Sequence, residues 1–235
     1  MLMSARLGEA VGRAGTPIRT CRWPLAVSVA LALSACTRQM PEFPPVDAGQ
    51  RIGAPGAELR DVEGNVYKTV RIGAQLWMAE NYRLERTPDG RSLRSFVYDD
   101  DPERYGRFGR LYPWDIAMNG ATKEHAAGIC PEGWHVPSDA DWRTLIEHLG
   151  GESVAGRKLL PGQASGFEAY PSGGADYTGR YVYFGQEAMF WSSTTTEVGR
   201  ANHWGTNIDG RLSVFAARQA ARVAVRCVQD SPAAR

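Results

Sequence analysis

The sequence predicts an α+β fold in which short strands surround one main helix, and three observations lead to this fold class. Runs of β-forming residues bounded by Gly, Asn and Asp stand early in the folded part and again at its end. A helical pattern with a clear start and stop lies between these runs. The chain also has 26 glycines and 10% aromatic residues, which favours strands joined by tight turns over a helical bundle.

Residues 1–35 have the pattern of a bacterial export signal. Arg19 and Arg22 precede an apolar run, residues 24–33, that is too short to span a membrane, since a spanning helix needs about 20 apolar residues. The run leads into "LSAC", which resembles the lipobox of bacterial lipoproteins. We therefore predict that Cys36 becomes an acylated N-terminus bearing palmitate-type chains. An ordinary signal peptide with an incidental cysteine is the alternative.

The segment that follows predicts a location in the cell envelope. Thr37 rather than Asp comes after Cys36, which by resemblance to enterobacterial sorting predicts the outer membrane. Two or three acyl chains hold a protein at the bilayer far better than one. Residues 36–56 are rich in Pro and Gly and show no hydrophobic period, so we expect a tether between the membrane and the folded domain.

The folded domain is expected over residues 57–230, followed by a short tail at 231–235. Its first part predicts three short strands, because β-forming residues alternate with Gly-containing turns. A polar, irregular stretch follows, and a short helix is expected after Pro113. The strands are expected at residues 58–62, 66–72 and 75–79, and the irregular stretch at 84–108.

The main helix is predicted between Ser138 and Gly150. Ser138 suits the N-cap, acidic residues occupy the first turn, and Gly150 suits the C-terminal end. His148 is expected at the surface, and a second short helix is expected at 153–160. Apolar residues spaced i, i+3, i+4 and i+7 line one face of the main helix and are expected to pack inward: Trp142, Leu145, Ile146 and Leu149.

The rest of the domain predicts strands and turns. Trp191 lies in an apolar run and is expected to point into the core. Asp209–Gly210 is a strong turn dipeptide and predicts a hairpin. In the final strand Val223, Val225 and Cys227 alternate, so they share one face. The other strands are expected near 180–184, 188–194, 201–207 and 211–216.

Two of the four cysteines predict a disulfide. Cys21 leaves with the signal peptide and Cys36 carries lipid, so Cys130 and Cys227 remain as an even pair in an oxidising compartment. Closing so long a loop stabilises a fold by about 4–5 kcal/mol in chain-entropy models. A zinc site or a redox pair is the alternative, but the sequence has no C-x-x-C and only four histidines.

Charge and composition argue against several partners. The chain has 27 Lys and Arg against 26 Asp and Glu and no basic stripe, so no nucleic acid is expected. We expect no cofactor and no metal, because His125, His135, His148 and His203 are dispersed. One acidic group is a weak candidate for Ca²⁺, which prefers clustered oxygens, although a solvated loop is the simpler interpretation: Asp99, Asp100, Asp101 and Glu103.

No catalytic motif is visible. The sequence contains no G-x-S-x-G, H-E-x-x-H or P-loop, and Ser192 and Ser193 are expected to make sheet hydrogen bonds. Aromatic and amide side chains are better candidates for ligand contact, because rings stack on sugars and amides bind their hydroxyls. These candidates are Trp204, Asn202, Asn207 and Tyr181. For most aromatic side chains of this region, however, a place in the core is the default interpretation.

Five segments, in order, resemble a known family: "GNVYKTVRIGAQLWMAENY", "YGRFGRLYPWDIAM", "CPEGWHVPSDADWRTL", "FWSST" and "VRCVQD". They resemble the Fibrobacter succinogenes major paralogous domain, which is found in bacterial surface lipoproteins and secreted proteins. The resemblance spans about residues 58–230, the whole folded part. It implies a cell-surface location, and the family brings no assigned activity with it.

A remoter resemblance bears on the fold. "GWHVPSDADW" looks like a stretch of formylglycine-generating enzymes, in which a terminal "RCV" also recurs. This implies a C-type-lectin-like fold: a small twisted antiparallel sheet, one or two main helices and long irregular loops. Those enzymes bind copper through a cysteine pair shortly before the terminal motif. Residues 213–222 contain no cysteine here, so the copper chemistry is not implied.

We therefore expect a lipid-anchored, non-enzymatic envelope module that binds glycans or proteins. Its partners would be the membrane, through the N-terminal lipid, and glycans or proteins of the envelope. An envelope enzyme with an unrecognised site and a purely structural envelope protein are the alternatives. An exposed aromatic platform would favour the binding module. A deep pocket lined by carboxylates or histidines with shifted pKa values would favour the enzyme.

Overall fold

The computed structural model describes residues 40–44 and 50–231. The predicted export signal, the lipid attachment site Cys36 and nearly all of the tail at 231–235 lie outside these residues. Among the helices of the described part, none has the length and apolar character needed to cross a membrane.

The first of two five-stranded sheets joins the beginning of the domain to its end. The strands β4 (Thr69–Ile72) and β5 (Gln75–Met78) form a hairpin, and the last strand of the described residues pairs with β5 through Val228 and Trp77. Both ends of the domain therefore lie in one sheet. Its order is β1 (Ala54–Pro55), β4 (Thr69–Ile72), β5 (Gln75–Met78), β14 (Val228–Gln229) and β7 (Trp134–His135).

Strand β1 lies inside residues 36–56, the range expected to be a tether. It pairs with β4, and the N–H groups of Ile52 and Gly53 both donate to the carbonyl of Ala164. Backbone pairing in the described part therefore begins before Ala57.

The second sheet contains the predicted hairpin. Its two strands meet at a turn in which Asn207 N–H donates to the Arg211 carbonyl, and Gly210 takes a positive φ of 78° there, as its lack of a Cβ permits. Strand β13 (Val223–Ala224) pairs in parallel with β10 (Glu187–Glu197). The order is β12 (Leu212–Arg218), β11 (Arg200–Asn207), β10 (Glu187–Glu197), β13 (Val223–Ala224) and β6 (Leu111–Tyr112).

Short ribbons and turns complete the fold. Two two-stranded ribbons pair β2 (Leu59–Arg60) with β3 (Val66–Tyr67) and β8 (Gly174–Ala175) with β9 (Tyr181–Val182). The short helix expected after Pro113 is present as α2 (Trp114–Ala117). The remaining small elements are η2 (Tyr98–Asp100), α1 (Pro102–Tyr105) and η3 (Gly106–Phe108).

The main helix follows the prediction closely. Helix α3 (Asp139–His148) is capped by Ser138, whose side chain accepts from Asp141 N–H while the Asp141 carboxylate accepts from Ser138 N–H. The second helix, α4 (Glu152–Leu159), is also present. The four predicted inward residues are buried, and His148 is exposed.

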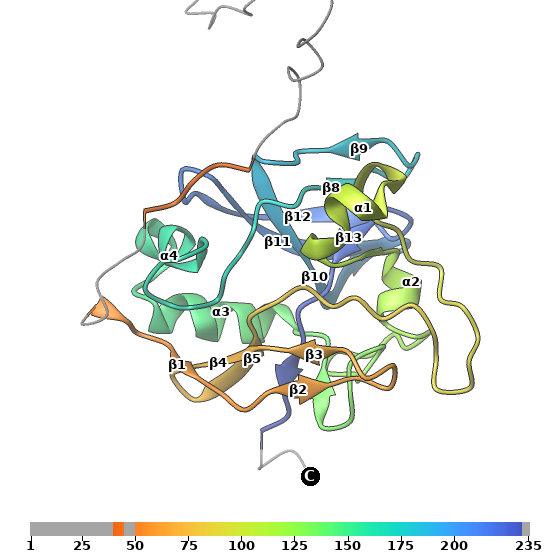
Figure 1. The fold of residues 1–235 in the computed structure, drawn as a ribbon, viewed down its shortest axis with the longest axis horizontal. Coiled ribbons are helices and arrows are strands. Elements are labelled where there is room, and N and C mark those ends of the chain that lie inside the picture. Colours follow the sequence, from red (N-terminus) through yellow and green to blue (C-terminus); the bar gives the residue numbers. More distant parts are fainter. Residues whose placement is uncertain (1–39, 45–49, 232–235) are drawn as a thin grey trace, which may run out of the picture. The chain divides into compact units, whose positions relative to one another are not determined.

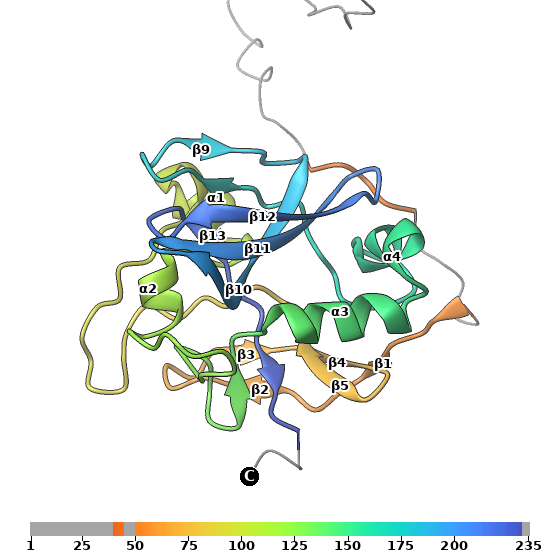
Figure 2. The ribbon, with the colours of Figure 1, turned by 180° about the vertical axis from the view of Figure 1, so that it is seen from behind.

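Helix α3 lies between the two sheets (Figures 1 and 2). Trp142 of this helix contacts Trp77 of the first sheet at 4.8 Å between ring centroids and stacks near Trp204 of the second at 6.3 Å. Large aromatic side chains bury much apolar surface, so this layer joins the sheets into one core.

The predicted final strand is in fact two short strands in different sheets. Its alternation is nevertheless confirmed, because Val223, Val225 and Cys227 all belong to one buried cluster. On the opposite side of the same segment, Arg226 is almost completely buried. This segment thus crosses from the second sheet to the first, and its two faces pack against different parts of the interior.

The fold is mixed, with mostly sheet and a few short helices, as the sequence predicts. In place of one small antiparallel sheet, the described residues form two five-stranded sheets, one of them with a parallel pair. The difference arises because the final segment divides between the sheets, which a single strand pattern does not reveal.

Candidate functional site

Trp204, the centre of the expected ligand site, is part of the core. Its side chain is 3% exposed, and its indole N–H donates to Asp139 Oδ1 at 2.9 Å. Trp204 therefore offers no exposed ring to a ligand, and the default interpretation, a place in the core, is the one that the structure shows. The physical reason is that Trp204 lies on the face of β11 that packs against α3, where the helix supplies both an apolar neighbour and an acceptor for the indole.

The other three expected ligand residues are half-buried and serve the protein's own structure. Asn202 donates to Asp139 Oδ2 at 2.7 Å. The Asn207 side-chain oxygen accepts from the N–H groups of Asp209 and Arg211 and holds the hairpin turn. Tyr181 donates its hydroxyl to Asp100 Oδ1 at 2.6 Å, and burial together with this bond raises its pKa to about 12. The structure does not bring these residues together at an open surface.

The acidic group proposed for Ca²⁺ is used locally. Asp101 accepts from Arg104 N–H as the N-cap of α1, and Asp100 accepts from Tyr181. Across the residues that the structure describes, the one group of three or more potential ligand side chains within 4.8 Å of one another lies elsewhere. The solvated loop is therefore the interpretation that the geometry favours.

Ser192 and Ser193 are buried. Ser192 Oγ donates to Asp139 Oδ1 at 2.7 Å, a bond from the sheet to helix α3 and not within the sheet, and Ser193 Oγ has no hydrogen-bond partner among the described residues.

The second sheet and the β8–β9 ribbon enclose a hollow of about 270 Å³. We call it the tyrosine hollow and define it by six of its lining residues: Tyr177, Tyr183, Met189, His203, Arg218 and Val223. Ala175 of the ribbon pairs with Arg222, immediately before β13 of this sheet, and Figure 2 shows β9 above the strands of the sheet. The floor is mostly apolar, while the rim carries aromatic and basic groups.

Both rim tyrosines are exposed, Tyr177 by 56% and Tyr183 by 50%. Tyr177 stands in the turn of the ribbon, where Asp176 Oδ1 accepts from Thr178 N–H and Arg180 N–H. The guanidinium of Arg218 lies 4.6 Å from the centroid of the Tyr177 ring, within the range of a cation–π contact. The rim is therefore an ordered aromatic edge.

Tyr183 is held in an unusual backbone conformation. Its φ is +61°, which bulky residues rarely adopt and which costs on the order of 1–3 kcal/mol. Its carbonyl accepts from the N–H groups of Gln186 and Glu187, so the turn itself fixes the ring at the rim. Strain of this kind is often found at functional positions.

His203 lies at the bottom of the hollow. Its ring packs perpendicular to Trp191, and within the described part of the chain its Nδ1 has no hydrogen-bond partner. Burial lowers the pKa of His203 to about 4, so the imidazole is neutral at pH 7. A neutral ring keeps the floor apolar.

A second arrangement brings together two of the dispersed histidines. We call it the histidine cluster: His125, His135, Asp141 and Asp230. His135 Nε2 lies 3.4 Å from His125 Nδ1 and 3.4 Å from Asp141 Oδ2, and His125 Nδ1 lies 3.5 Å from Asp141 Oδ2. Asp230 Oδ1 accepts from His135 Nδ1 at 2.7 Å. His148 and His203 lie apart from this cluster.

The pKa values in the cluster reflect opposing causes. Burial alone would lower the pKa of His135, but hydrogen bonds to Asp141 and Asp230 raise it above its ordinary value. Burial alone would raise the pKa of Asp141, but hydrogen bonds from His135 and Ser138 lower it. These shifts favour a charged His135 imidazole beside a charged Asp141 carboxylate.

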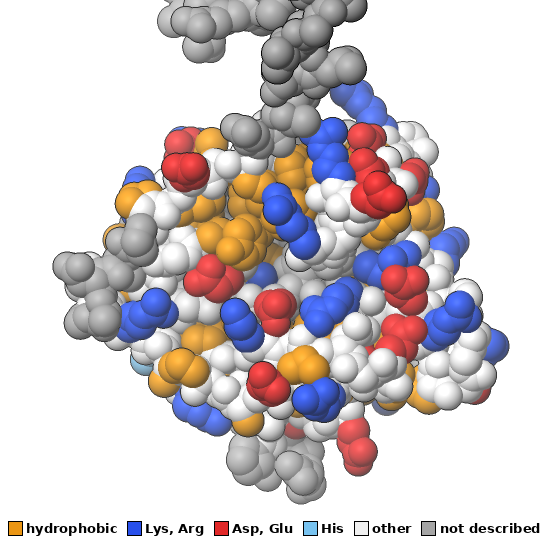
Figure 3. All heavy atoms as spheres, in the orientation of Figure 1, with side chains coloured by type: hydrophobic (Ala, Val, Ile, Leu, Met, Phe, Trp, Pro, Cys, Tyr) orange, Lys and Arg blue, Asp and Glu red, His pale blue; other side chains and the backbone are white. Residues whose placement is uncertain are grey.

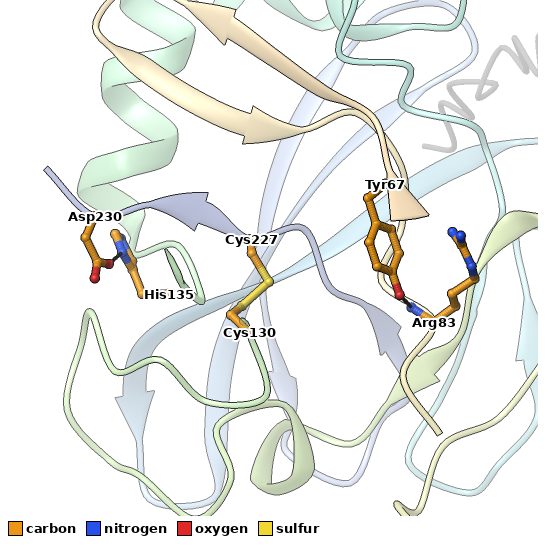
Figure 4. Close-up of a disulfide and its surroundings, with 6 residues drawn as sticks. All are labelled: Tyr67, Arg83, Cys130, His135, Cys227 and Asp230. Carbon is orange, nitrogen blue, oxygen red and sulfur yellow. Dashed lines mark hydrogen bonds and ion pairs between the residues drawn. A yellow bond between two sulfur atoms is a disulfide. The ribbon is translucent and has the colours of Figure 1, made fainter. Parts of the chain in front are cut away.

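The predicted disulfide between Cys130 and Cys227 is present, with the two Cα atoms 5.9 Å apart. Figure 4 shows it beside the His135–Asp230 bond. Both interactions join the segment that leads into β7 to the end of the chain. The C-terminal segment is thus held by the disulfide and by the hydrogen bond between His135 and Asp230.

The face shown in Figure 3 mixes acidic and basic side chains and has an area of hydrophobic side chains in its upper half. Among the described residues on this face, no stripe of one sign is available to a polyanion. This face therefore adds no electrostatic site to the two arrangements above.

Sequence analysis did not place Tyr177 and Tyr183 at a hollow, and it missed the histidine cluster. His135 and Asp230 are 95 residues apart in sequence, so no local spacing relates them. The positive φ of Tyr183 also leaves no signal in the residue type, since glycine would be the usual choice there.

Comparison with known proteins adds one finding. A family model described as the Fibrobacter succinogenes major domain matches residues 70–229. No curated protein and no solved structure matches the chain.

Proposed function

The chain belongs to the Fibrobacter succinogenes major domain family, and from this premise we propose that it is a lipid-anchored, non-catalytic module of the cell envelope that binds glycans. The observation that carries the binding proposal is the tyrosine hollow, with two exposed tyrosines standing over an apolar floor. Concave sites with an apolar lining and a few polar groups are the usual form of ligand sites in proteins.

The chemistry of the rim favours a sugar. The faces of pyranose rings carry C–H groups that pack on aromatic rings, and Tyr177 and Tyr183 offer such rings at the surface. The guanidinium of Arg218 lies beside Tyr177 and can donate to sugar hydroxyls. Tyrosine also contributes contact area with little loss of conformational entropy. A protein segment with an exposed aromatic side chain is the competing ligand.

The proposal extends to the fold and the location. We propose a C-type-lectin-like fold, supported by the pairing of both domain ends in one sheet and by the small number of helices. The anchor and the outer-membrane location rest on the "LSAC" motif and on Thr37. Palmitate labelling of cells that express the chain tests the anchor: incorporation should disappear in Cys36→Ala and persist in Cys21→Ala.

Binding of the full-length chain to a glycan and polysaccharide array, with and without Ca²⁺, tests the ligand. We expect saturable binding that is lost in Tyr177→Ala and in Tyr183→Ala. Tyr170→Ala is the matched control, because Tyr170 is exposed but is not among the residues that line the hollow.

Binding that survives both rim substitutions would place the glycan elsewhere and overturn this use of the hollow. If no sugar binds, the glycan proposal fails, and cross-linking on intact cells then tests the protein segment as the ligand.

A further inference from the structure

The histidine cluster has the dimensions of a metal site. Its three facing atoms, His125 Nδ1, His135 Nε2 and Asp141 Oδ2, form a nearly equilateral triangle with sides of 3.4, 3.4 and 3.5 Å. Zinc bonds to histidine nitrogen and carboxylate oxygen are about 2.0–2.1 Å long in tetrahedral sites, which places ligand atoms about 3.3–3.4 Å apart. A single ion slightly above the triangle would reach all three atoms at ordinary bond lengths.

We propose that His125, His135 and Asp141 bind a divalent transition-metal ion of the zinc class, with a fourth coordination position open to solvent. Two imidazoles and one carboxylate suit Zn²⁺ and its neighbours in the first transition row. Ca²⁺ and Mg²⁺ prefer oxygen ligands and fit this set poorly. The proposal replaces the sequence-based expectation of no metal and is independent of the glycan proposal.

The surrounding residues orient the ligand atoms. Asp230 binds His135 Nδ1 at 2.7 Å and leaves Nε2 directed at the other two ligands. A carboxylate on the far nitrogen of a metal-binding histidine fixes the ring and its tautomer. Ser138 donates to Asp141 Oδ2 from both its backbone N–H and its hydroxyl, at 2.8 and 2.7 Å. The rotatable hydroxyl would give up its bond when this oxygen binds the ion, and the backbone N–H would keep the carboxylate in place. Two of the three ligands are therefore fixed before an ion arrives.

The third ligand provides access. The His125 side chain is 54% exposed, whereas those of His135 and Asp141 are 7% and 17% exposed. An ion could therefore enter from the His125 side. The backbone of His125 has φ +60°, a conformation that few residues favour, although Asn and His tolerate it better than most. The loop thus brings an exposed imidazole over two buried ligand atoms.

Titration of the full-length chain with Zn²⁺, followed by calorimetry, tests the proposal. We expect one ion per chain and a rise in the midpoint of thermal unfolding, since an ion that binds only the folded state stabilises it. Co²⁺ should give the strong visible absorption of a four-coordinate site, and Zn²⁺ should displace it. Metal binding should release protons, because the ligands must be deprotonated.

Substitutions separate this site from other ligands of the chain, including Cys21 and Cys36. His125→Asn keeps a residue that tolerates the positive φ and should weaken binding by at least about 100-fold, since it removes one of three ligands. Asp230→Asn should weaken it by about 10–100-fold while leaving one ion per chain, as expected for a positioning residue. His148→Asn is the matched control and should bind as the unaltered chain does.

The competing interpretation is a hydrogen-bonded cluster that needs no ion. In that case Zn²⁺ would bind with no fixed stoichiometry, or His125→Asn and His148→Asn would change its affinity equally. Either result would overturn the proposal. A Co²⁺ spectrum of weak, six-coordinate type would overturn the tetrahedral geometry that the three distances indicate.

Discussion

The C-terminal segment and the rim of the tyrosine hollow hold their side chains in opposite ways. At the C-terminal segment a disulfide, a buried guanidinium and an aspartate–histidine bond fix residues 226–230. At the rim, Tyr183 is half exposed and stands in a backbone conformation that costs free energy. Strong interactions in the first region make the fold stable enough to maintain strain in the second.

Of the substitutions that test this comparison, removal of the disulfide should have the largest effect on the free energy of unfolding. Cys130 and Cys227 are 97 residues apart, so their bond removes much entropy from the unfolded chain. We expect the double substitution to Ala to lower the free energy of unfolding by about 4–5 kcal/mol. Urea denaturation measures this, and a loss below about 1 kcal/mol would show that the C-terminal segment is held by other means.

Replacing the buried Arg226 should have the next largest effect. Its guanidinium donates to Asn81 Oδ1 and to the carbonyls of Met78, Phe167 and Glu168, and burial lowers its pKa to about 9. Arg226→Ala leaves these acceptors without donors and opens a cavity, which should cost on the order of 3–4 kcal/mol.

The matched control for that substitution is Arg211→Ala, because Arg211 is exposed and should cost less than about 0.5 kcal/mol. Equal losses in urea denaturation for the two variants would mean that burial of the Arg226 guanidinium contributes nothing to the C-terminal segment.

Local signals explain which parts of the fold were predictable. The main helix carries its own cap in Ser138, its first-turn acids and its apolar stripe, all between Ser138 and Leu149. The disulfide followed from counting cysteines. By contrast, the Asp209–Gly210 turn predicts a hairpin but does not say which of its faces the helix covers. The hairpin is confirmed, whereas Trp204, a candidate for ligand contact, lies on the covered face.

The two candidate sites depend on long-range contacts. In the tyrosine hollow, Arg218 of the second sheet lies against the ring of Tyr177, in the turn of the β8–β9 ribbon. In the histidine cluster, Asp230 meets His135 across 95 residues. Residue type predicted neither contact, because the first depends on how the ribbon packs on the second sheet and the second on the pairing of β14 with β7. The sites therefore become visible only once the sheets are assembled.

The pH dependence of stability tests the floor of the tyrosine hollow. The pKa of His203 falls from 6.5 to about 4 on folding, so between these values the unfolded chain binds the proton more readily. The contribution to stability is complete above pH 6.5 and is lost as the pH falls towards 4. Its size is about 3 kcal/mol, since one pKa unit corresponds to about 1.4 kcal/mol.

The variant His203→Phe should remove this part of the acid slope in urea denaturation at a series of pH values, with little cost at pH 7, because Nδ1 has no partner within the described residues. His148→Phe, at an exposed position, should keep the slope of the unaltered chain. Identical slopes in all three proteins would mean that the imidazole of His203 reaches water.

The smallest effect concerns the strain at Tyr183, and a comparison of Gly with Ala isolates it. Both substitutions remove the ring, so they differ only in the backbone. At Tyr183, where φ is +61°, Gly should give a higher free energy of unfolding than Ala by about 1 kcal/mol. At Tyr177, which lacks a positive φ, Ala should be the more stable by about 0.5 kcal/mol.

Urea denaturation measures the difference in free energy of unfolding between the Gly and Ala variants. Opposite signs of this difference at Tyr183 and Tyr177 would locate the strain at one tyrosine of the rim. If Ala were the more stable at both positions, the rim would be as relaxed as the rest of the surface, and the contrast with the C-terminal segment would lose its physical basis.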